Sequence, residues 1–435
     1  MNLTVLIPTF NEADNLAELL PRLTATVERL TPGSWEILVV DGGSRDRTVA
    51  AAQEHGARVV GQRRPGFGGA MRAGLEEAKG DFILTMDADL SHEPNFAGKL
   101  WANRDRADII IASRYCPGGA AYMPWTRKLL SRTLNFVFSH GLSLGVRDLS
   151  SGFRLYRSDL LKRLPLHGRN FEILEETLVR AHMDGARILE IPFTYFPRVR
   201  GSSHARIFRF GFDLLRTFLE MWRLRNSIEA ADYDERAFYS LIPPQRYWQR
   251  RRHKIVTHFA RASGLTIDVG CGSSVILQSL NRAVGVDVSL PKVRYLRRHG
   301  LPVVAASTFA LPFADECADC VISSEVIEHI PVDPVVFMEL DRVLKPGGLL
   351  ILGTPDYGTW VWPAIEWLYG RLMPGGYAHE HISHYTAAGL QRLLAAMGYR
   401  IVGQRSILRG ELILAARRGD RPADRGAIER ALATA

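Results

Sequence analysis

Short apolar runs alternate with amphipathic stretches through the first half of the chain. Residues 3–7 are apolar, and residues 16–23 carry apolar side chains at helical spacing. Further apolar runs end near Val40 and Val60, and residues 82–85 form another. Runs of four to eight apolar residues predict buried strands, and strands that alternate with helices predict a parallel sheet covered on both faces. The first half of the chain is therefore predicted to be a doubly wound α/β domain.

The same alternation resumes in the second half, after a polar and acidic stretch at 226–235 and the pair Pro243-Pro244. Residues 247–262 predict a basic helix, and apolar runs then recur as far as 349–353. The sequence therefore predicts two doubly wound, Rossmann-like domains. The predicted boundaries are 1–226 for the first domain, 227–244 for a linker, 245–417 for the second domain and 418–435 for a mobile polar tail.

Charge and cysteine content narrow the partners and the compartment. The chain of 435 residues has a net charge of +9, and residues 114–226 carry most of the excess of Lys and Arg. A basic segment predicts an anionic partner such as a phosphate or a membrane surface, and no nucleic-acid motif is present. Four cysteines form no disulfide framework, and we see neither a membrane-spanning run nor a signal peptide. We therefore expect a cytoplasmic protein without a nucleic-acid partner.

One basic stretch has two interpretations. Residues 207–224 predict an amphipathic helix rich in Phe, Leu and Trp that also carries Arg209, Arg216 and Arg223. Such a helix lies on an anionic membrane or packs on its own domain, and the sequence favours neither. In the first case the protein is peripheral at the inner face of the membrane.

Candidate chemistry in the first domain begins at the end of the run 82–85. Asp87 and Asp89 follow it, at the sheet edge where open α/β sheets bind ligands. Two carboxylates this close suit Mg2+ or Mn2+, although solvated acids at a strand end would look the same. Glu12 and Asp41 end neighbouring segments and could accept hydrogen bonds from a base or ribose. The glycines of 66–69 either approach a ligand or simply open the next helix, and alone they favour the second interpretation.

Taken together, these segments resemble a known family. The resemblance rests on 6–12, 39–44, 86–92, 113–115, 131–132, 148–154 and 197–203. In order, they are similar to GT-A glycosyltransferases of family 2, above all to the dolichyl- and polyprenyl-phosphate mannosyltransferases. The resemblance covers nearly all of residues 1–226.

The resemblance implies a nucleotide-sugar donor linked to GDP or UDP and a polyprenyl phosphate acceptor, with mannose or glucose favoured. Its implied nucleotide-sugar pocket consists of Pro8, Phe10, Glu12, Asp41 and Asp87. Asp87 and Asp89 would bind the metal, with Asp89 catalytic, and Arg114, Arg132 and Arg198 would face phosphate. Gly42 stands where the family often has an acid, and His204 where it often has Lys, which leaves the base and the sugar open.

The second domain opens on a different pattern. The run 265–269 leads into Asp268-Val269-Gly270-Cys271-Gly272, and another run ends at Asp287. Glycines followed by an acid at this spacing are typical of nucleotide-type cofactor binding. Together with 311–313, 325–329 and 344–348 they resemble class I S-adenosylmethionine-dependent methyltransferases. That resemblance implies that Asp268, Gly270 and Gly272 surround the methionine part and that Asp287 binds the ribose; NAD is the rival cofactor.

The methyl acceptor is less defined. His381 and His384 could supply a general base for O-methylation, or a metal site, and each could equally be structural. Aromatic residues in 359–373 suit a lipid, a glycan or a partner, or ordinary helix packing.

These patterns predict a bifunctional enzyme that transfers a sugar to polyprenyl phosphate and methylates a related glycan or lipid. The alternative is sugar transfer to a non-lipid hydroxyl beside a cofactor-binding domain that does not turn over.

Overall fold

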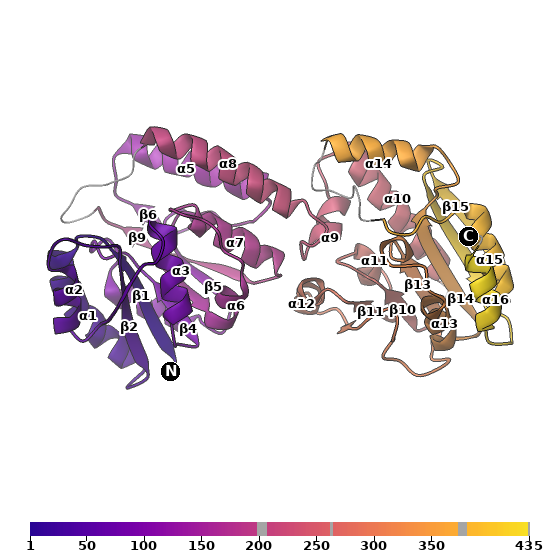
Figure 1. Cartoon of the computed structure of the whole chain (residues 1–435), viewed down its shortest axis with the longest axis horizontal. Helices are drawn as coiled ribbons and strands as arrows, with labels where there is room; N and C mark the ends of the chain where they lie inside the picture. The colour runs from indigo at the N-terminus through magenta and orange to yellow at the C-terminus, as the bar shows by residue number, and fades with distance from the viewer. Residues whose placement is uncertain (198–206, 262–263, 373–380, 434–435) are drawn as a thin grey trace. The chain divides into compact units, whose positions relative to one another are not determined.

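The computed structural model describes residues 1–197, 207–261, 264–372 and 381–433. The chain divides into two compact units, Met1–Arg225 and Asn226–Ala435 (Figure 1). Each contains one seven-stranded sheet, so the predicted fold class of two doubly wound α/β domains is confirmed. Among the described residues, no helix is both long enough and apolar enough to span a bilayer.

The first unit is built on a sheet with the order β3-β2-β1-β4-β7-β5-β8. All neighbouring strands run parallel except β7, which is antiparallel to both β4 and β5. Two further strands, β6 and β9, form a separate parallel pair. The strands are β1 Leu3–Thr9, β2 Trp35–Asp41, β3 Arg58–Gly61, β4 Phe82–Thr85, β5 Ile109–Ser113, β6 Ala120–Ala121, β7 Arg154–Arg157, β8 Ile188–Pro192 and β9 Thr194–Tyr195.

Helices cover both faces of this sheet because its strands are apolar on both sides. In β1, Val5 and Ile7 join a core cluster with α1, whereas Leu6 points into the other cluster, with α3 and α7. The helices are α1 Ala13–Leu30, α2 Thr48–Glu54, α3 Phe67–Glu77, η1 Pro94–Phe96, α4 Ala97–Ala102, α5 Trp125–Gly141, α6 Ser158–Arg163, α7 Ile173–Met183 and α8 Ile207–Arg225.

The second unit has the strand order β12-β11-β10-β13-β14-β16-β15. Six strands run in one direction, and β16 inserts antiparallel between β14 and β15. The order turns at β10, whose carboxyl end is therefore the expected ligand-binding edge. The strands are β10 Thr266–Val269, β11 Ala283–Asp287, β12 Val303–Ala305, β13 Ala318–Ser324, β14 Leu344–Pro355, β15 Arg400–Ile407 and β16 Glu411–Arg417.

The helices of the second unit pack two core clusters against its sheet. Ile267 faces the cluster that includes α13 and α15, whereas Ile322 faces the cluster that includes α10. The helices are α9 Tyr233–Phe238, α10 Pro243–Ala260, α11 Val275–Gln278, α12 Leu290–Arg298, η2 Ile327–His329, α13 Pro334–Val343, α14 Val361–Leu372, α15 Ala387–Ala396 and α16 Arg425–Leu432.

Two segments differ from the sequence-based expectation. Helix α9 lies within residues 227–244, which we expected to be a linker, and its Tyr233 is buried in the second unit. The tail expected to be mobile contains α16 instead. Asp424 caps this helix by accepting from the Ala427 N–H, and Ile428 is fully buried against the core. Ala423, Ala431 and Leu432 pack beside it on the same cluster, and such tertiary packing stabilises a short helix that would be marginal alone.

Candidate active sites

The two carboxylates after β4 differ in how they are held. Asp89 is 5% exposed, and its Oδ1 accepts hydrogen bonds from the N–H and the hydroxyl of Ser91. The Asp87 side chain is 39% exposed. The end of this strand therefore carries a buried carboxylate fixed by hydrogen bonds, that of Asp89, and a partly exposed one, that of Asp87.

His92, which the sequence analysis gave no role, lies behind Asp87. Its Nδ1 accepts a hydrogen bond of 3.0 Å from the Asp87 N–H, and its Nε2 lies 3.8 Å from Asp87 Oδ2. Burial lowers the pKa of His92, so the ring is neutral and carries its proton on Nε2, facing Asp87. The ring also stacks on Phe153 at 4.8 Å between centroids. His92 thus fixes the backbone and the carboxylate of Asp87.

Asp41 is the last residue of the neighbouring strand β2. Its Oδ2 accepts from the N–H groups of Gly43 at 2.9 Å and Ser44 at 3.0 Å. Its buried Oδ1 has no hydrogen-bond partner among the described residues. Pro8 and Thr9 of β1 pair with Val40 and Asp41, so the start of the 8–12 segment adjoins this carboxylate.

The rest of that segment frames the same edge. Phe10 is exposed, and a Cβ on Gly42 would lie 3.4 Å from its ring. The carboxylate of Glu12 accepts from the Asn15 side chain, and its N–H donates to Thr48. Four predicted pocket residues, Pro8, Phe10, Glu12 and Asp41, therefore gather at the carboxyl ends of β1 and β2.

The predicted arginines have different environments. Arg114 makes a bidentate ion pair with the fully buried Asp148, with Nε–Oδ2 at 2.8 Å and Nη2–Oδ1 at 2.6 Å. Burial alone would lower the pKa of Arg114, but the Asp148 carboxylate raises it. Arg132 on α5 is exposed, with its guanidinium 5.9 Å from the Tyr115 ring centre. Arg198 lies outside the described residues.

The glycines of 66–69 serve chain packing. A Cβ on Gly66 would come within 2.4 Å of the Arg169 carbonyl oxygen, and one on Gly68 within 2.2 Å of the Gly168 oxygen. The Gly68 N–H donates to the Arg169 carbonyl. The contacts of this loop therefore support the interpretation in which its glycines open the next helix.

Asp87 and Asp89 fit a Mg2+ or Mn2+ ion in chemistry and number. Hard carboxylate oxygens suit these cations, which usually keep several positions for water and substrate phosphate. Among the residues that the structure describes, neither acid belongs to a set of three closely placed Asp, Glu, His or Cys ligands. A site supplied by two carboxylates would leave room for a diphosphate.

In the second unit, Gly270 and Gly272 shape the turn after β10. Their φ angles are +69° and +55°, and an added Cβ would lie 2.3 Å from Val326 and 2.4 Å from Asp234, respectively. The Gly272 N–H donates to Asp287 Oδ2 at 2.8 Å. Asp287 therefore fixes the glycine turn as well as the end of β11.

Buried polar atoms without partners collect at this edge of the sheet. Asp268 Oδ2 and the hydroxyls of Ser323 and Ser324 are buried and have no hydrogen-bond partner within the described parts of the chain. Burial raises the pKa of Asp268 to about 7, with further contributions from Asp287 and Asp234. A cofactor that carries an ammonium, a sulfonium and ribose hydroxyls would satisfy such groups, so these residues fit S-adenosylmethionine.

Asp234 was missed by the sequence analysis because it lies on α9, in the expected linker. Its carboxylate accepts from the Ser273 N–H at 2.9 Å, and Lys292 Nζ lies 3.5 Å away. A residue 39 positions upstream therefore holds the glycine turn. No local pattern around Asp234 indicates this contact.

The two predicted histidines, His381 and His384, lie in different environments. His381 is buried, its Nδ1 lies 2.8 Å from the Tyr357 hydroxyl, and its ring centre is 4.9 Å from that of His329. Burial, with His329 and His384 nearby, lowers the pKa of His381 to about 4. His384 is exposed and stacks on Tyr357 at 4.0 Å.

Comparison with known proteins identifies both units. Residues 4–164 match the family described as Glycosyl transferase family 2, and residues 267–352 match the family described as Methyltransferase domain. A dolichol-phosphate mannosyltransferase from Pyrococcus furiosus is 36% identical over 212 residues, which are 47% of this chain and 59% of that protein. Polyprenol monophosphomannose synthase from Mycolicibacterium smegmatis is 37% identical over 216 residues, or 46% of this chain and 79% of that protein.

Among solved structures, glucosyl-3-phosphoglycerate synthase from Mycobacterium tuberculosis superposes with a TM-score of 0.42 at 21% identity, over 51% of this chain and 79% of that one. The two family matches confirm both resemblances that the motifs predicted.

Proposed function

The chain belongs to glycosyl transferase family 2 through its first unit, and we propose that this unit transfers mannose or glucose from a nucleotide sugar to a polyprenyl phosphate. The carboxylate pair Asp87 and Asp89 at the end of β4 carries the proposal. The two relatives support the acceptor, because their names specify mannose transfer to dolichol or polyprenol phosphate. The chain spans 59% of the length of the first relative.

The donor end of the site is prepared by hydrogen bonds that already exist. Asp41 Oδ1 is a buried acceptor for a base or ribose N–H or O–H group, and Phe10 offers an exposed ring to stack on a base. Ser91 donates to the Asp89 carboxylate, and His92 holds the Asp87 backbone with its Nε2 3.8 Å from the Asp87 carboxylate, all without help from a ligand. A Mg2+ or Mn2+ ion bound there would offset charge on the departing diphosphate. Groups held in place in this way can stabilise charge in the transition state without a rearrangement of the protein.

The acceptor side needs positive charge rather than a base. A phosphate monoester is already anionic at neutral pH, so its oxygen can attack the anomeric carbon as the bond to the diphosphate oxygen breaks, with inversion. Arg132 is exposed and suited to hold that phosphate. Arg114 is paired with Asp148, so we assign it to positioning Tyr115, whose ring it contacts at 5.2 Å.

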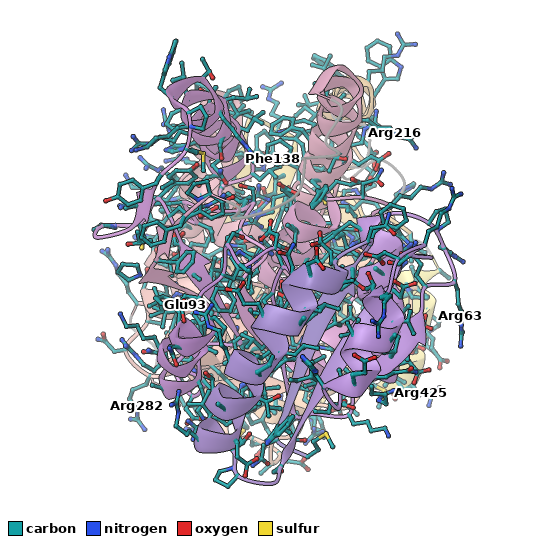
Figure 2. All side chains as sticks on the ribbon, turned by 90° about the vertical axis from the view of Figure 1, so that its left-hand side faces the viewer. Arg63, Glu93, Phe138, Arg216, Arg282 and Arg425 are labelled. Carbon is teal, nitrogen blue, oxygen red and sulfur yellow. The ribbon has the colours of Figure 1, made fainter. Side chains whose placement is uncertain are left out.

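A surface on α5 and α8 supports a lipid acceptor. Trp125 at the start of α5 is 74% exposed, and Arg132 lies two turns further along the same helix. Phe138 of α5 meets Phe218 of α8, with ring centroids 5.2 Å apart, and Arg216 points outward from α8 (Figure 2). Exposed apolar and basic side chains together are typical of helices that lie on an anionic membrane. The exposed apolar residues are Trp125, Leu129, Leu130, Phe136, Val137, Leu215 and Leu219.

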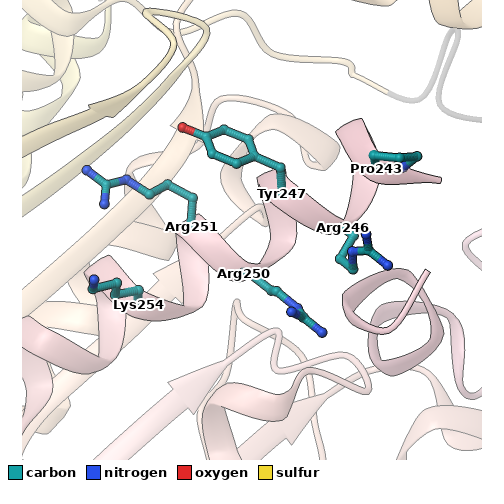
Figure 3. A pocket seen from close by; sticks show the side chains of 6 residues that line it. All are labelled: Pro243, Arg246, Tyr247, Arg250, Arg251 and Lys254. Atoms are coloured by element: carbon teal, nitrogen blue, oxygen red, sulfur yellow. The ribbon is translucent and has the colours of Figure 1, made fainter. Parts of the chain in front are cut away.

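The second unit is a methyltransferase domain, and we propose that it methylates a hydroxyl of a lipid-borne glycan with S-adenosylmethionine. Asp268 and Asp287 would hold the cofactor, which supplies an electrophilic methyl group. The acceptor class is supported by a surface with the same chemistry as α5 and α8. One face of α10 lines an open pocket of about 380 Å³ (Figure 3), formed by Pro243, Arg246, Tyr247, Arg250, Arg251 and Lys254.

Exposed apolar residues accompany this basic face. Leu241, just before α10, is 91% exposed, and Trp360, just before α14, is 80% exposed. Trp248 of α10 contacts Trp362 of α14 at 5.8 Å between centroids, so these two helices are neighbours. Arginines beside exposed Leu and Trp side chains suit anionic lipid headgroups.

Sugar transfer is tested with radiolabelled GDP- and UDP-sugars and a short polyprenyl phosphate, in Mn2+ or EDTA. We expect metal-dependent label in the organic phase. Asp89→Asn should abolish it, whereas Asp105→Asn, an exposed acid before β5, should not. Donor hydrolysis without a lipid product would contradict the polyprenyl acceptor.

Membrane binding is tested by co-sedimentation with phosphatidylcholine vesicles, with and without phosphatidylglycerol. We expect binding to the anionic vesicles that falls with added salt. Trp125→Ser combined with Leu129→Ser should weaken it, and Val402→Ser, an exposed apolar residue on β15, is the matched control. Equal binding of all three proteins would contradict the α5 surface.

A further inference from the structure

A buried carboxylate and two imidazoles meet beside the cofactor edge of the second unit. Glu328, His329 and His381 each offer a ligand atom, and these atoms lie within 4.8 Å of one another. Within the described ranges, no other set of three His, Cys, Asp or Glu residues comes this close. Neither family match assigns a role to these three residues.

Glu328 lacks a partner that its burial demands. The residue is 0% exposed, and its Oε2 accepts a 3.1 Å hydrogen bond from the Thr354 hydroxyl. Its Oε1 is also buried and has no hydrogen-bond partner among the described residues. An unsatisfied buried carboxylate oxygen costs free energy unless a proton or a cation accompanies it.

His381 is oriented as metal-binding histidines are. Its Nδ1 lies 2.8 Å from the Tyr357 hydroxyl and 3.4 Å from Glu366 Oε1. A carboxylate or hydroxyl on one ring nitrogen fixes the ring and directs the other nitrogen toward the metal. The backbone contributes as well, because the Ile382 and Ser383 N–H groups donate to the Glu328 carbonyl. The two segments that carry the ligands are thus tied together.

The set lies next to the glycine turn. Val326 is the residue that a Cβ on Gly270 would strike, and Glu328 follows it by two positions, in η2. The Glu328 carboxylate also contacts Thr354, near the end of β14, so the set lies at the carboxyl edge of the sheet, close to this turn.

We propose that Glu328, His329 and His381 bind a divalent first-row transition cation, such as Zn2+ or Mn2+, on the methyl-acceptor side of the second unit. Two imidazoles with one carboxylate suit such ions, and three protein ligands leave a position for an oxygen of the acceptor. A hydroxyl bound there would have a lowered pKa. The acceptor role rests on the proposed methyl transfer, whereas binding of the ion does not.

The test uses the full-length chain freed of metal and titrated with Co2+, in the Asp89→Asn background to remove the site of the first unit. We expect one equivalent of Co2+ by equilibrium dialysis, with visible absorption typical of nitrogen ligation. Glu328→Gln and His329→Ala should abolish both signals. Glu366→Gln, which removes the carboxylate beside His381 Nδ1 and the Tyr357 hydroxyl, should weaken binding by about 10–100-fold.

His384→Ala is the matched control, since His384 stacks on Tyr357 but is not one of the three ligands. It should bind Co2+ as the parent does. Each variant is also titrated with S-adenosylhomocysteine, so that a loss of folding is distinguished from a loss of the ion. Absence of Co2+ from the Asp89→Asn protein, or equal binding by Glu328→Gln and His384→Ala, would overturn the proposal. Co2+ binding without any methyl transfer would instead contradict only the proposed reaction.

Discussion

The two units use the same edge of a similar sheet but treat its buried acids differently. In the first unit, each of three acids near this edge has an oxygen that accepts hydrogen bonds: Asp41 from two N–H groups, Asp89 from Ser91, and Asp148 from Arg114. In the second unit, Asp268 and Glu328 are buried with too few donors, and burial raises their pKa values to about 7 and about 8, respectively.

The difference indicates what each edge is prepared to receive. A solvent-exposed carboxylate at a strand end can attract a hydrated cation, which suits Asp87 and its 39% exposure. Poorly solvated carboxylates hold a proton until a cationic ligand replaces it. The comparison therefore predicts that the charge at the edge of the second unit depends on its ligand.

Removing the Arg114–Asp148 ion pair should have the largest effect on stability. Asp148→Ala leaves the Arg114 guanidinium buried without its carboxylate, and we expect the first unit to lose about 3–5 kcal/mol of unfolding free energy. Asp159→Ala, which removes an exposed partner of Arg163, should cost less than about 1 kcal/mol. Calorimetry with and without S-adenosylhomocysteine separates the two units, since only the second should shift. Equal losses would show that the Arg114 pair does not stabilise the fold.

Asp89→Asn comes next. We expect sugar transfer to fall by at least about 10²–10³-fold, the usual cost of removing one preorganised electrostatic group. Binding of S-adenosylmethionine, measured by calorimetry on the same sample, should not change. Loss of both sugar transfer and S-adenosylmethionine binding would contradict the independence of the two sites.

Asp287→Ala tests the second edge. The Gly272 N–H would lose its acceptor, and a ribose contact would go with it, so we expect cofactor binding to weaken by about 1–3 kcal/mol. Sugar transfer should be unaffected. Unchanged cofactor affinity would exclude Asp287 from the ribose site.

The smallest effect is on pH dependence. Because the pKa of Asp268 is raised to about 7, its carboxylate is ionised only above that pH, and affinity for the cationic cofactor should rise from pH 6 to pH 8. Stability without cofactor should change in the opposite direction. The contribution of this group is complete below its unfolded pKa of about 3.9 and is lost as pH rises through 7.

Asp268→Asn should flatten the Asp268 part of both profiles. Calorimetric titrations at pH 6, 7 and 8 measure the affinity for the cofactor. Thermal unfolding over the same pH range measures the stability without cofactor. If the cofactor affinity of the wild-type protein does not vary with pH, the predicted ionisation of Asp268 is contradicted.

The sequence predicted features that depend on neighbours along the chain. Apolar runs predicted the strands and placed Asp41, Asp87 and Asp268 at or just after the strand ends, because a strand end fixes where the next side chains lie. The glycine turn of the second unit was equally local.

Features that depend on distant partners were not predicted. His92 matters because it stacks on Phe153, and Arg114 is neutralised by a residue 34 positions away. The glycines at 66 and 68 meet carbonyls near residue 169 rather than a ligand. Periodicity and motif spacing contain no information about such contacts, which arise only when the sheet assembles.

The contact of Asp234 with the turn at Ser273 has a consequence for dividing the protein. A fragment that starts at residue 245 contains every motif of the methyltransferase family match, yet it lacks the carboxylate that faces Lys292. A fragment that starts at Asn226 keeps it. We expect the shorter fragment to be digested much faster by a protease at equal concentration. Residues 226–244 therefore belong to the folded second unit, although they precede the matched methyltransferase sequence.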